Sequence, residues 1–228
     1  MKNVVKTLAI AFLSVLLIAG YASAVEYTFY NITANDTTPD PDSGLTNPEI
    51  GELQLLLDVT DKGNNQVLFT FTNTGTEDSS ITDIYFDDDI PLLYFNSFVY
   101  NTTGVDFSVD AAPNNLPGGS DPLYTFSSDY SYDSDSPAQP NGVNPGEELG
   151  ILFDLNQNEG ATFDNLIASL NDGSFRIGVH VQGFEDGGSE GFIAPKDPVD
   201  GTTPEPATML LLGSGLVGLV GLKRRKNS

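Results

Sequence analysis

The chain has 228 residues, a formal net charge of −23 and no cysteine. Without cysteine it forms no disulfide and no thiolate site, and a surface this acidic repels phosphate backbones, which excludes nucleic acid as a partner. The single histidine also excludes zinc sites built from several histidine or cysteine ligands.

The first 24 residues have the pattern of a secretory signal peptide. Two lysines precede an apolar stretch over 8–18, and Ala22 and Ala24 put small residues at the two positions that signal peptidase reads. We predict cleavage before Val25. The exported body then has three cationic and 31 acidic residues over 25–200, a formal charge of −28. Such a charge keeps a secreted protein soluble.

Residues 25–195 are predicted to form one domain of the all-β class. Short runs that alternate between apolar and polar residues are separated there by clusters of Gly, Pro, Asn and Asp. We expect a single antiparallel β-sandwich, jelly-roll-like, with one short helix. Strands are expected at 27–33, 53–59, 67–72, 81–86, 92–100, 105–109, 149–155, 175–182 and 191–194.

The short helix is predicted over 163–170, where apolar residues recur at helical spacing. Thr162 is placed to cap its start, and Gly173 follows its end. The stretch 110–146 is rich in Pro, Gly, Ser and Asp, and we expect it to be mostly exposed loop with one strand at 123–126.

His180 is the one histidine available for acid–base chemistry. It lies on the polar side of the 175–182 strand, between Arg176 and Gln182, and no nucleophile signature such as G-x-S-x-G accompanies it. We therefore expect a solvated strand histidine, no catalytic residue and no enzyme activity. A carboxylate pair that cleaves a glycosidic bond stays open as an alternative, because the acidic residues are too numerous to single out one pair.

Calcium is the one metal that the composition suits. Residues 154–160 place oxygen-bearing side chains at alternate positions, but Glu159 and Asn165 depart from the EF-hand pattern. We favour a strand-to-helix loop over a calcium loop and assign no metal or cofactor; calcium that stabilises the acidic body stays open as an alternative. Weaker acidic clusters are Asp87, Asp88 and Asp89, and Asp129, Asp133 and Asp135.

Three tyrosines in the polar stretch are candidates for sugar stacking. Carbohydrate-binding sandwiches present a platform of aromatic rings, and Tyr124, Tyr130 and Tyr132 are close in sequence. The chain has no tryptophan, so a platform built from these rings is a modest one.

Residues 207–228 form a predicted membrane segment with a basic end. The 16 residues of 207–222 are rich in Leu and Gly, and as a helix they span about 24 Å against a hydrocarbon core of roughly 30 Å. The basic run over 223–226 is expected to stay in the cytoplasm. Before this segment, 196–206 is a Pro-rich tether that we expect to be extended.

The tail resembles the three-part sorting signal of PEP-CTERM proteins. Its parts are Pro204-Glu205-Pro206, the Leu- and Gly-rich segment, and Arg224-Arg225. The resemblance implies that the chain is a substrate of exosortase, a membrane-embedded cysteine transpeptidase, in a Gram-negative-type bacterium that makes exopolysaccharide. The motif is read by that enzyme and is not itself catalytic. The body is also similar to a recurring class of PEP-CTERM ectodomains over 79–89, 141–155 and 170–193.

Two classes of function follow from the processing route. The first is an acidic structural or matrix protein of a bacterial envelope or biofilm. It crosses the inner membrane, is anchored there transiently and, after cleavage near Pro206, reaches the cell surface or the extracellular matrix. The alternative is a carbohydrate-binding or carbohydrate-cleaving β-sandwich that acts on exopolysaccharide.

Overall fold

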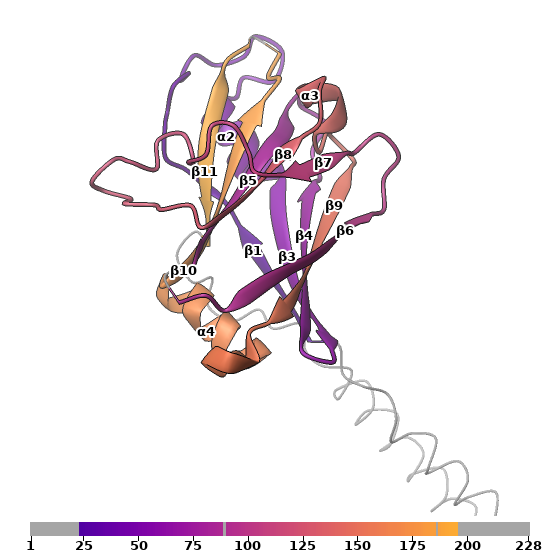
Figure 1. The fold of residues 1–228 in the computed structure, drawn as a ribbon. Helices are drawn as coiled ribbons and strands as arrows, with labels where there is room; N and C mark the ends of the chain where they lie inside the picture. The colour runs from indigo at the N-terminus through magenta and orange to yellow at the C-terminus, as the bar shows by residue number, and fades with distance from the viewer. Residues whose placement is uncertain (1–22, 89, 186, 196–228) are drawn as a thin grey trace, which may run out of the picture.

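The computed structural model describes residues 23–88, 90–185 and 187–195, and these form two antiparallel β-sheets packed face to face (Figure 1). The five-stranded sheet has the order β1-β3-β4-β9-β6. Its strands are β1 (Ala24–Thr28), β3 (Leu55–Gly63), β4 (Gln66–Asn73), β9 (Glu148–Leu155) and β6 (Leu93–Tyr100).

The second sheet has six strands in the order β2-β11-β10-β5-β8-β7, and every pair of neighbours in both sheets is antiparallel. The predicted all-β class and its two antiparallel sheets are confirmed. The strands of the second sheet are β2 (Tyr30–Asn31), β11 (Ser189–Ala194), β10 (Phe175–Gln182), β5 (Ser80–Asp88), β8 (Tyr130–Ser134) and β7 (Phe107–Val109).

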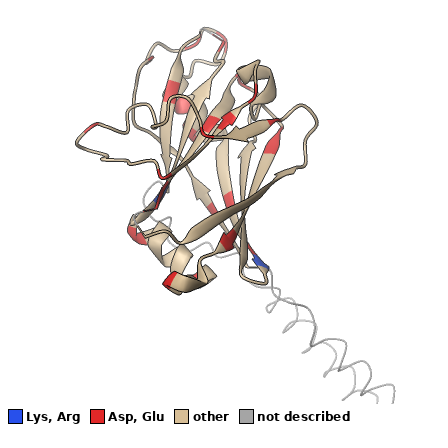
Figure 2. Ribbon diagram, in the orientation of Figure 1, with Lys and Arg blue, Asp and Glu red and all other residues tan. Residues whose placement is uncertain are grey.

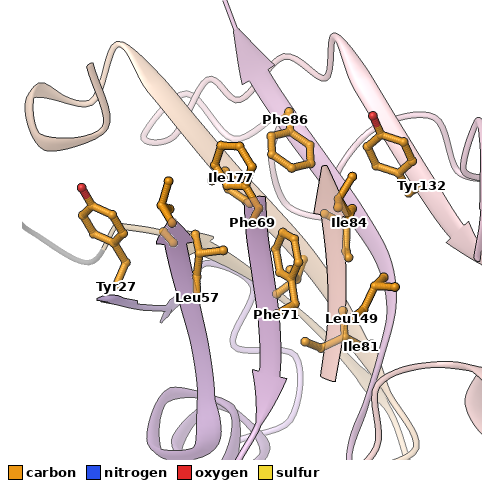
Figure 3. Packing of buried hydrophobic residues seen from close by; sticks show 14 of the residues in the cluster. Tyr27, Leu57, Phe69, Phe71, Ile81, Ile84, Phe86, Tyr132, Leu149 and Ile177 are labelled. Atoms are coloured by element: carbon orange, nitrogen blue, oxygen red, sulfur yellow. The ribbon is translucent and has the colours of Figure 1, made fainter. Parts of the chain in front are cut away.

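The core between the sheets is built around phenylalanine rings (Figure 3). Phe69 of β4 meets Phe86 of β5 edge-on with ring centroids 5.3 Å apart, and Phe86 also lies 5.0 Å from Phe153 of β9. Edge-to-face aromatic pairs add about 0.5–1.5 kcal/mol to the burial of their area. The chain has no cysteine, so this packing stabilises the body without any disulfide.

The predicted strand at 27–33 is two strands in different sheets. β1 pairs with β3, whereas β2 pairs with β11 of the opposite sheet. Phe29, which separates them, is fully buried. Alternation continues through this crossing, because Tyr27 and Phe29 both point into the core, so the sequence pattern does not reveal it.

The predicted amphipathic helix is confirmed as α4 (Phe163–Asp172). The Thr162 side chain accepts from the Asn165 N–H, and Gly173 ends the helix in the left-handed region at φ 79°. Two short elements beside β9 were not predicted. They are α3 (Ala138–Asn141), before the strand, and the 3-10 turn η1 (Gln157–Glu159), after it.

One further helix, α2 (Asn47–Gln54), was not predicted. The Thr46 side chain caps it and Glu49 reaches back to the Thr46 N–H, which is a capping box. Of its two large apolar residues, Ile50 is buried and Leu53 is 68% exposed. An apolar stripe is therefore missing, and only the capping residues mark this helix in the sequence.

The prediction for 110–146 was wrong about its strand. Residues 123–126 are not a strand, whereas β8 lies at Tyr130–Ser134. Most of 110–128 is exposed loop, as expected, but four of its residues are buried. Residues 110–128, named the cover segment here, lie on the outer face of the six-stranded sheet, where Leu116 and Phe126 form a second buried cluster with Tyr85 and Ile193.

Candidate functional site

A row of ionisable side chains crosses the outer face of the six-stranded sheet. Asp133 of β8 pairs in register with Asp83 of β5, which pairs with His180 of β10. The His180 ring, through Nδ1, lies 2.8 Å from Asp83 Oδ2. His180 is 6% exposed and Asp83 is 3% exposed. The row is thus a buried carboxylate–imidazole pair with a second carboxylate beside it.

The expectation that His180 is solvated was wrong. Strand alternation puts His180 on the outer face, as predicted, but the cover segment lies over that face. The backbone of Ala112 hydrogen-bonds to the Asp133 carboxylate, and Gly191, the β11 neighbour of His180, packs against the Pro117 carbonyl. A stretch that is distant in sequence therefore packs over neighbours of the histidine on both sides.

The row holds an acid–base pair without a nucleophile. Burial raises the pKa of Asp133, and Asp83 raises it further by its charge and by a hydrogen bond. A histidine oriented by a carboxylate is two thirds of a catalytic triad. In the described residues Nδ1 lies within hydrogen-bond distance of Asp83 and Gln182, and neither ring nitrogen has a serine or threonine hydroxyl as a hydrogen-bond partner. Nε2, where the nucleophile of a triad would bind, therefore has no such partner among these residues.

Arg176 fixes the cover segment to the sheet. Its guanidinium forms an ion pair with Asp87 of β5 and donates to the carbonyl oxygens of Tyr124 and Thr125, the latter at 3.0 Å. It also lies 5.4 Å from the centre of the Phe126 ring, within cation–π range. Arg176 therefore serves packing rather than an open site.

Glu190 of β11 is a buried anchor that sequence reasoning missed. Its side chain is fully buried and accepts hydrogen bonds from Asn31 Nδ2 at 3.0 Å, from the backbone N–H groups of Asn35 and Asp36 at 3.1 and 2.8 Å, and from the Thr33 hydroxyl. Several donors to one carboxylate offset the cost of burying its charge. The only sequence signal was a charged residue inside a strand otherwise made of small and apolar residues.

The three tyrosines do not form a platform for sugar stacking. Tyr132 is 2% exposed and packs edge-on against Phe86 in the core. The Tyr130 hydroxyl donates to the Leu93 carbonyl oxygen at 3.0 Å, and Tyr124 lies against Tyr30. Because β8 turns two of these rings inward, the three candidates for sugar stacking do not lie together on one face.

Residues 154–160 form the strand-to-helix loop that we favoured over a calcium loop. Asp154 accepts from Gln66 and Asn96 at 2.9 Å each, and these hydrogen bonds hold the pKa of its carboxyl low. Asn156 Oδ1 accepts from the Asn158 N–H and so caps the turn. Over the ranges that the structure describes, no group of three or more His, Asp or Glu side chains is placed to hold a metal ion.

The acidic cluster after β5 closes a turn. Asp88 accepts from the Leu92 N–H at 2.7 Å, and Asp129 accepts from the Asp88 N–H at 2.8 Å. Burial raises the pKa of Asp88 to about 7, and the charges of Asp129 and Asp87 add to the shift. Asp89 lies outside the described residues.

Most of the predicted processing site also lies outside the described residues. This holds for Ala22 and for the sorting-signal residues Pro204, Glu205, Pro206, Arg224 and Arg225. Ala24 begins β1, where it pairs with Thr60. No helix among the described residues is both long and apolar enough to cross a membrane, and the predicted span over 207–222 falls beyond them.

A protein-family model described as the PEP-CTERM protein-sorting motif matches residues 202–226. The chain carries a PEP-CTERM sorting signal. The matched range contains all five predicted sorting residues, which confirms the resemblance seen in the sequence. No curated protein and no solved structure matches the chain. The PEP-CTERM motif implies export, a transient stage at the membrane and processing by exosortase, while the role of the body rests on its own geometry.

Proposed function

We propose that this PEP-CTERM protein is a non-catalytic structural component of a bacterial surface or biofilm matrix, delivered there by exosortase cleavage near Pro206. The single observation that carries the proposal is the sorting motif at 202–226. A chain that is exported, held at the membrane and then cut is placed outside the cell as a folded body. The acidic body suits that role, because its charge keeps it soluble after release.

The polar chemistry of the body supports a structural role. His180 hydrogen-bonds to Asp83, and Glu190 accepts hydrogen bonds from the 31–36 segment. Arg176 forms an ion pair with Asp87 and donates to the cover segment. His180 and Glu190 are buried, and Arg176 is partly buried where it holds the cover segment. The residues most suited to catalysis are thus used to stabilise the fold.

Terminal-peptide mass spectrometry of surface material tests the processing route. In cells with the sorting enzyme we expect the mature form to begin at Val25 and to end near Pro206. In cells without the enzyme, the same protein should retain peptides from 207–228. Recovery of peptides from 210–222 in the mature form of normal cells would mean a permanent anchor and would overturn the sorting step.

Carbohydrate binding is the alternative function, and it has lost the platform on which it was based. A glycan array probed with the mature protein tests it without reference to any one residue. Specific binding to an exopolysaccharide would make carbohydrate recognition the primary role of the body. An empty array, together with protein found in the insoluble matrix, would favour the structural role.

A further inference from the structure

β6 is an edge strand with an unusual composition for this chain. It lies at the end of the five-stranded sheet and runs for eight residues, LYFNSFVY, without a charge or a proline. In Figure 2 it is tan along its whole length. The open edge of such a strand is a template for pairing with another strand, and natural proteins usually blunt it with charge or proline.

The other edges of the two described sheets are blunted. β2 and β7, at the ends of the six-stranded sheet, have two and three residues. β1, at the far end of the five-stranded sheet, carries the exposed Glu26. In a body with a formal charge of −28 over 25–200, most contacts between two copies bring carboxylates together. β6 is the long edge strand of the described sheets that has no charged side chain of its own.

A bulge gives β6 a symmetric pattern of faces. Its pairing with β9 shifts between Phe95 and Ser97, with Asn96 as the extra residue. Cross-strand partners point to the same face of a sheet, so the β9 partner of each β6 residue shows which face that residue is on. Leu93, Phe95, Phe98 and Tyr100 lie opposite core residues of β9, whereas Tyr94, Ser97 and Val99 lie opposite Asp154, Leu152 and Gly150 on the outer face.

Asn96 belongs to the outer face as well, because its side chain donates to Asp154. The order of faces from 93 to 100 is therefore inner, outer, inner, outer, outer, inner, outer, inner. It is the same when it is followed from either end, with its centre between Asn96 and Ser97. A regular strand of eight residues does not have this property, since its two ends face opposite sides.

We propose that two copies of this chain pair antiparallel through β6 about a two-fold axis between Asn96 and Ser97. Phe95 then lies opposite Phe98 of the partner subunit, and Tyr94 lies opposite Val99 of the partner subunit. Like faces meet at every position, so two five-stranded sheets join into one continuous sheet. Such an isologous contact closes on itself and gives a dimer rather than a fibre.

The side chains at this edge gain from the pairing. The rings of Phe95 and Phe98 are 5.1 Å apart, and Tyr100 continues the row at 5.7 Å from Phe98. Phe95 and Phe98 are only partly buried in the single chain, and aromatic pairs across strands stabilise a sheet by about 0.2–1 kcal/mol each. On the outer face, Asp154 lies beside Tyr94 in one copy, and Gly150 lies beside Val99 in the other copy. Because Tyr94 is opposite Val99 of the partner subunit, each Asp154 is in line with a glycine of the other copy and not with its Asp154.

The absence of cysteine makes the register directly testable. Tyr94→Cys and Val99→Cys are prepared in separate full-length chains, one with a mass tag, and mixed in detergent under mild oxidation. We expect a disulfide dimer that contains one chain of each kind. Each variant alone should give little product, because position 94 is about 17 Å along the strand from position 94 of the other copy. No mixed disulfide, or equal yields from the single variants, would overturn the proposal.

Sedimentation of the full-length chain supplies a second measurement. We expect the unmodified protein to sediment at twice its monomer mass and Ser97→Lys, which places two lysines beside the axis, at the monomer mass. The matched control is Thr70→Lys, on the same outer face but in the central strand β4, and it should stay dimeric. A dimer held together through 207–228 would persist in the Ser97→Lys variant. A monomeric parent, or equal loss in both lysine variants, contradicts the β6 dimer whether or not exosortase processes the chain.

Discussion

The carboxyl group of Asp88 illustrates what burial does to one acidic residue in this chain. Burial is the main cause that raises its pKa in the folded state to about 7, from an ordinary value of 3.8. The folded state therefore binds a proton that the unfolded state releases, so the free energy of unfolding falls as pH rises from about 4 to about 7. Asp88 costs stability at neutral pH, although its oxygen accepts from the Leu92 N–H.

We predict that Asp88→Asn raises the free energy of unfolding at pH 8 by about 1–3 kcal/mol. The amide oxygen still accepts from Leu92, while the charge is gone. At pH 4 the two proteins should have nearly equal stability, because Asp88 is then protonated. Urea unfolding at both pH values measures this. An asparagine variant that is less stable at pH 8 would show that the ionised carboxylate stabilises the turn.

Asp172 is the matched control with the opposite sign. Hydrogen bonds from the Ser174 side chain and N–H hold its pKa low. Its contribution is present above the unfolded pKa and is lost as pH falls through the folded pKa. Asp172→Asn should therefore lower stability at pH 7 and leave it unchanged near pH 2. Both substitutions remove a charge and keep an acceptor oxygen, so their opposite signs separate a charge that burial disfavours from a charge that hydrogen bonds favour.

Residue-level features were predictable from the sequence where they depend on local geometry. The face of His180 follows from alternation and the cap of α4 follows from Thr162. The burial of His180 and the donors around Glu190 depend on the cover segment and on 31–36, which are far away in the sequence. A local sequence pattern does not show which loop packs on which face of a sheet.

The element that most changes the surface of this fold is the cover segment, 110–128. It covers part of the outer face of the six-stranded sheet and buries a second apolar cluster there. Glycines on that face leave space for the segment. A side chain at Gly191 would place its Cβ 2.3 Å from the Pro117 carbonyl oxygen, and one at Gly178 would place it 2.6 Å from Leu116. The Leu116 side chain can rotate, whereas the backbone at Pro117 can only move with the segment.

We predict that Gly191→Ala displaces the cover segment and lowers the free energy of unfolding by about 1–3 kcal/mol, the usual cost of overpacking. Proteolysis by an enzyme that cuts after aromatic residues measures the displacement, because Phe126 of the cover segment is buried in the parent and is followed by a serine. New cleavage after Phe126 is the expected result. Ser189→Ala on the same strand is the control and should leave the digest unchanged. An unchanged digest for Gly191→Ala would mean that the segment is not held by this contact.

Elements with a strong local period were predicted well, and irregular ones were not. The alternating run 175–182 coincides with β10, and the helical spacing over 163–170 lies within α4. β8 was missed because its five residues, YSYDS, have too short a pattern, and α2 because it has no apolar stripe. Strand order was not predictable, since β5 meets β10 and β4 meets β9 only through long connections.

At the scale of the whole molecule, charge and packing oppose each other. The body has 31 acidic residues, and of its three cations Arg176 is already paired with Asp87. Burial and then the charges of Glu26 and Glu148 raise the pKa of Asp58 on the five-stranded sheet. Like charges that folding brings together favour the unfolded chain. The aromatic core offsets this repulsion without any disulfide.

Salt should therefore stabilise the mature protein. From 10 to 100 mM sodium chloride the Debye length falls from about 30 to about 10 Å, and repulsion between distant carboxylates is screened. We predict a rise in Tm, in which each 1 kcal/mol corresponds to about 2–4 °C for a chain of this size. Calcium chloride at equal ionic strength is the comparison, because calcium that only screens charge gives the same rise as sodium chloride. Protein treated first with a chelator and then melted in each salt gives the comparison. A rise that calcium produces and sodium chloride does not would instead indicate a specific calcium site and would return the 154–160 loop to consideration.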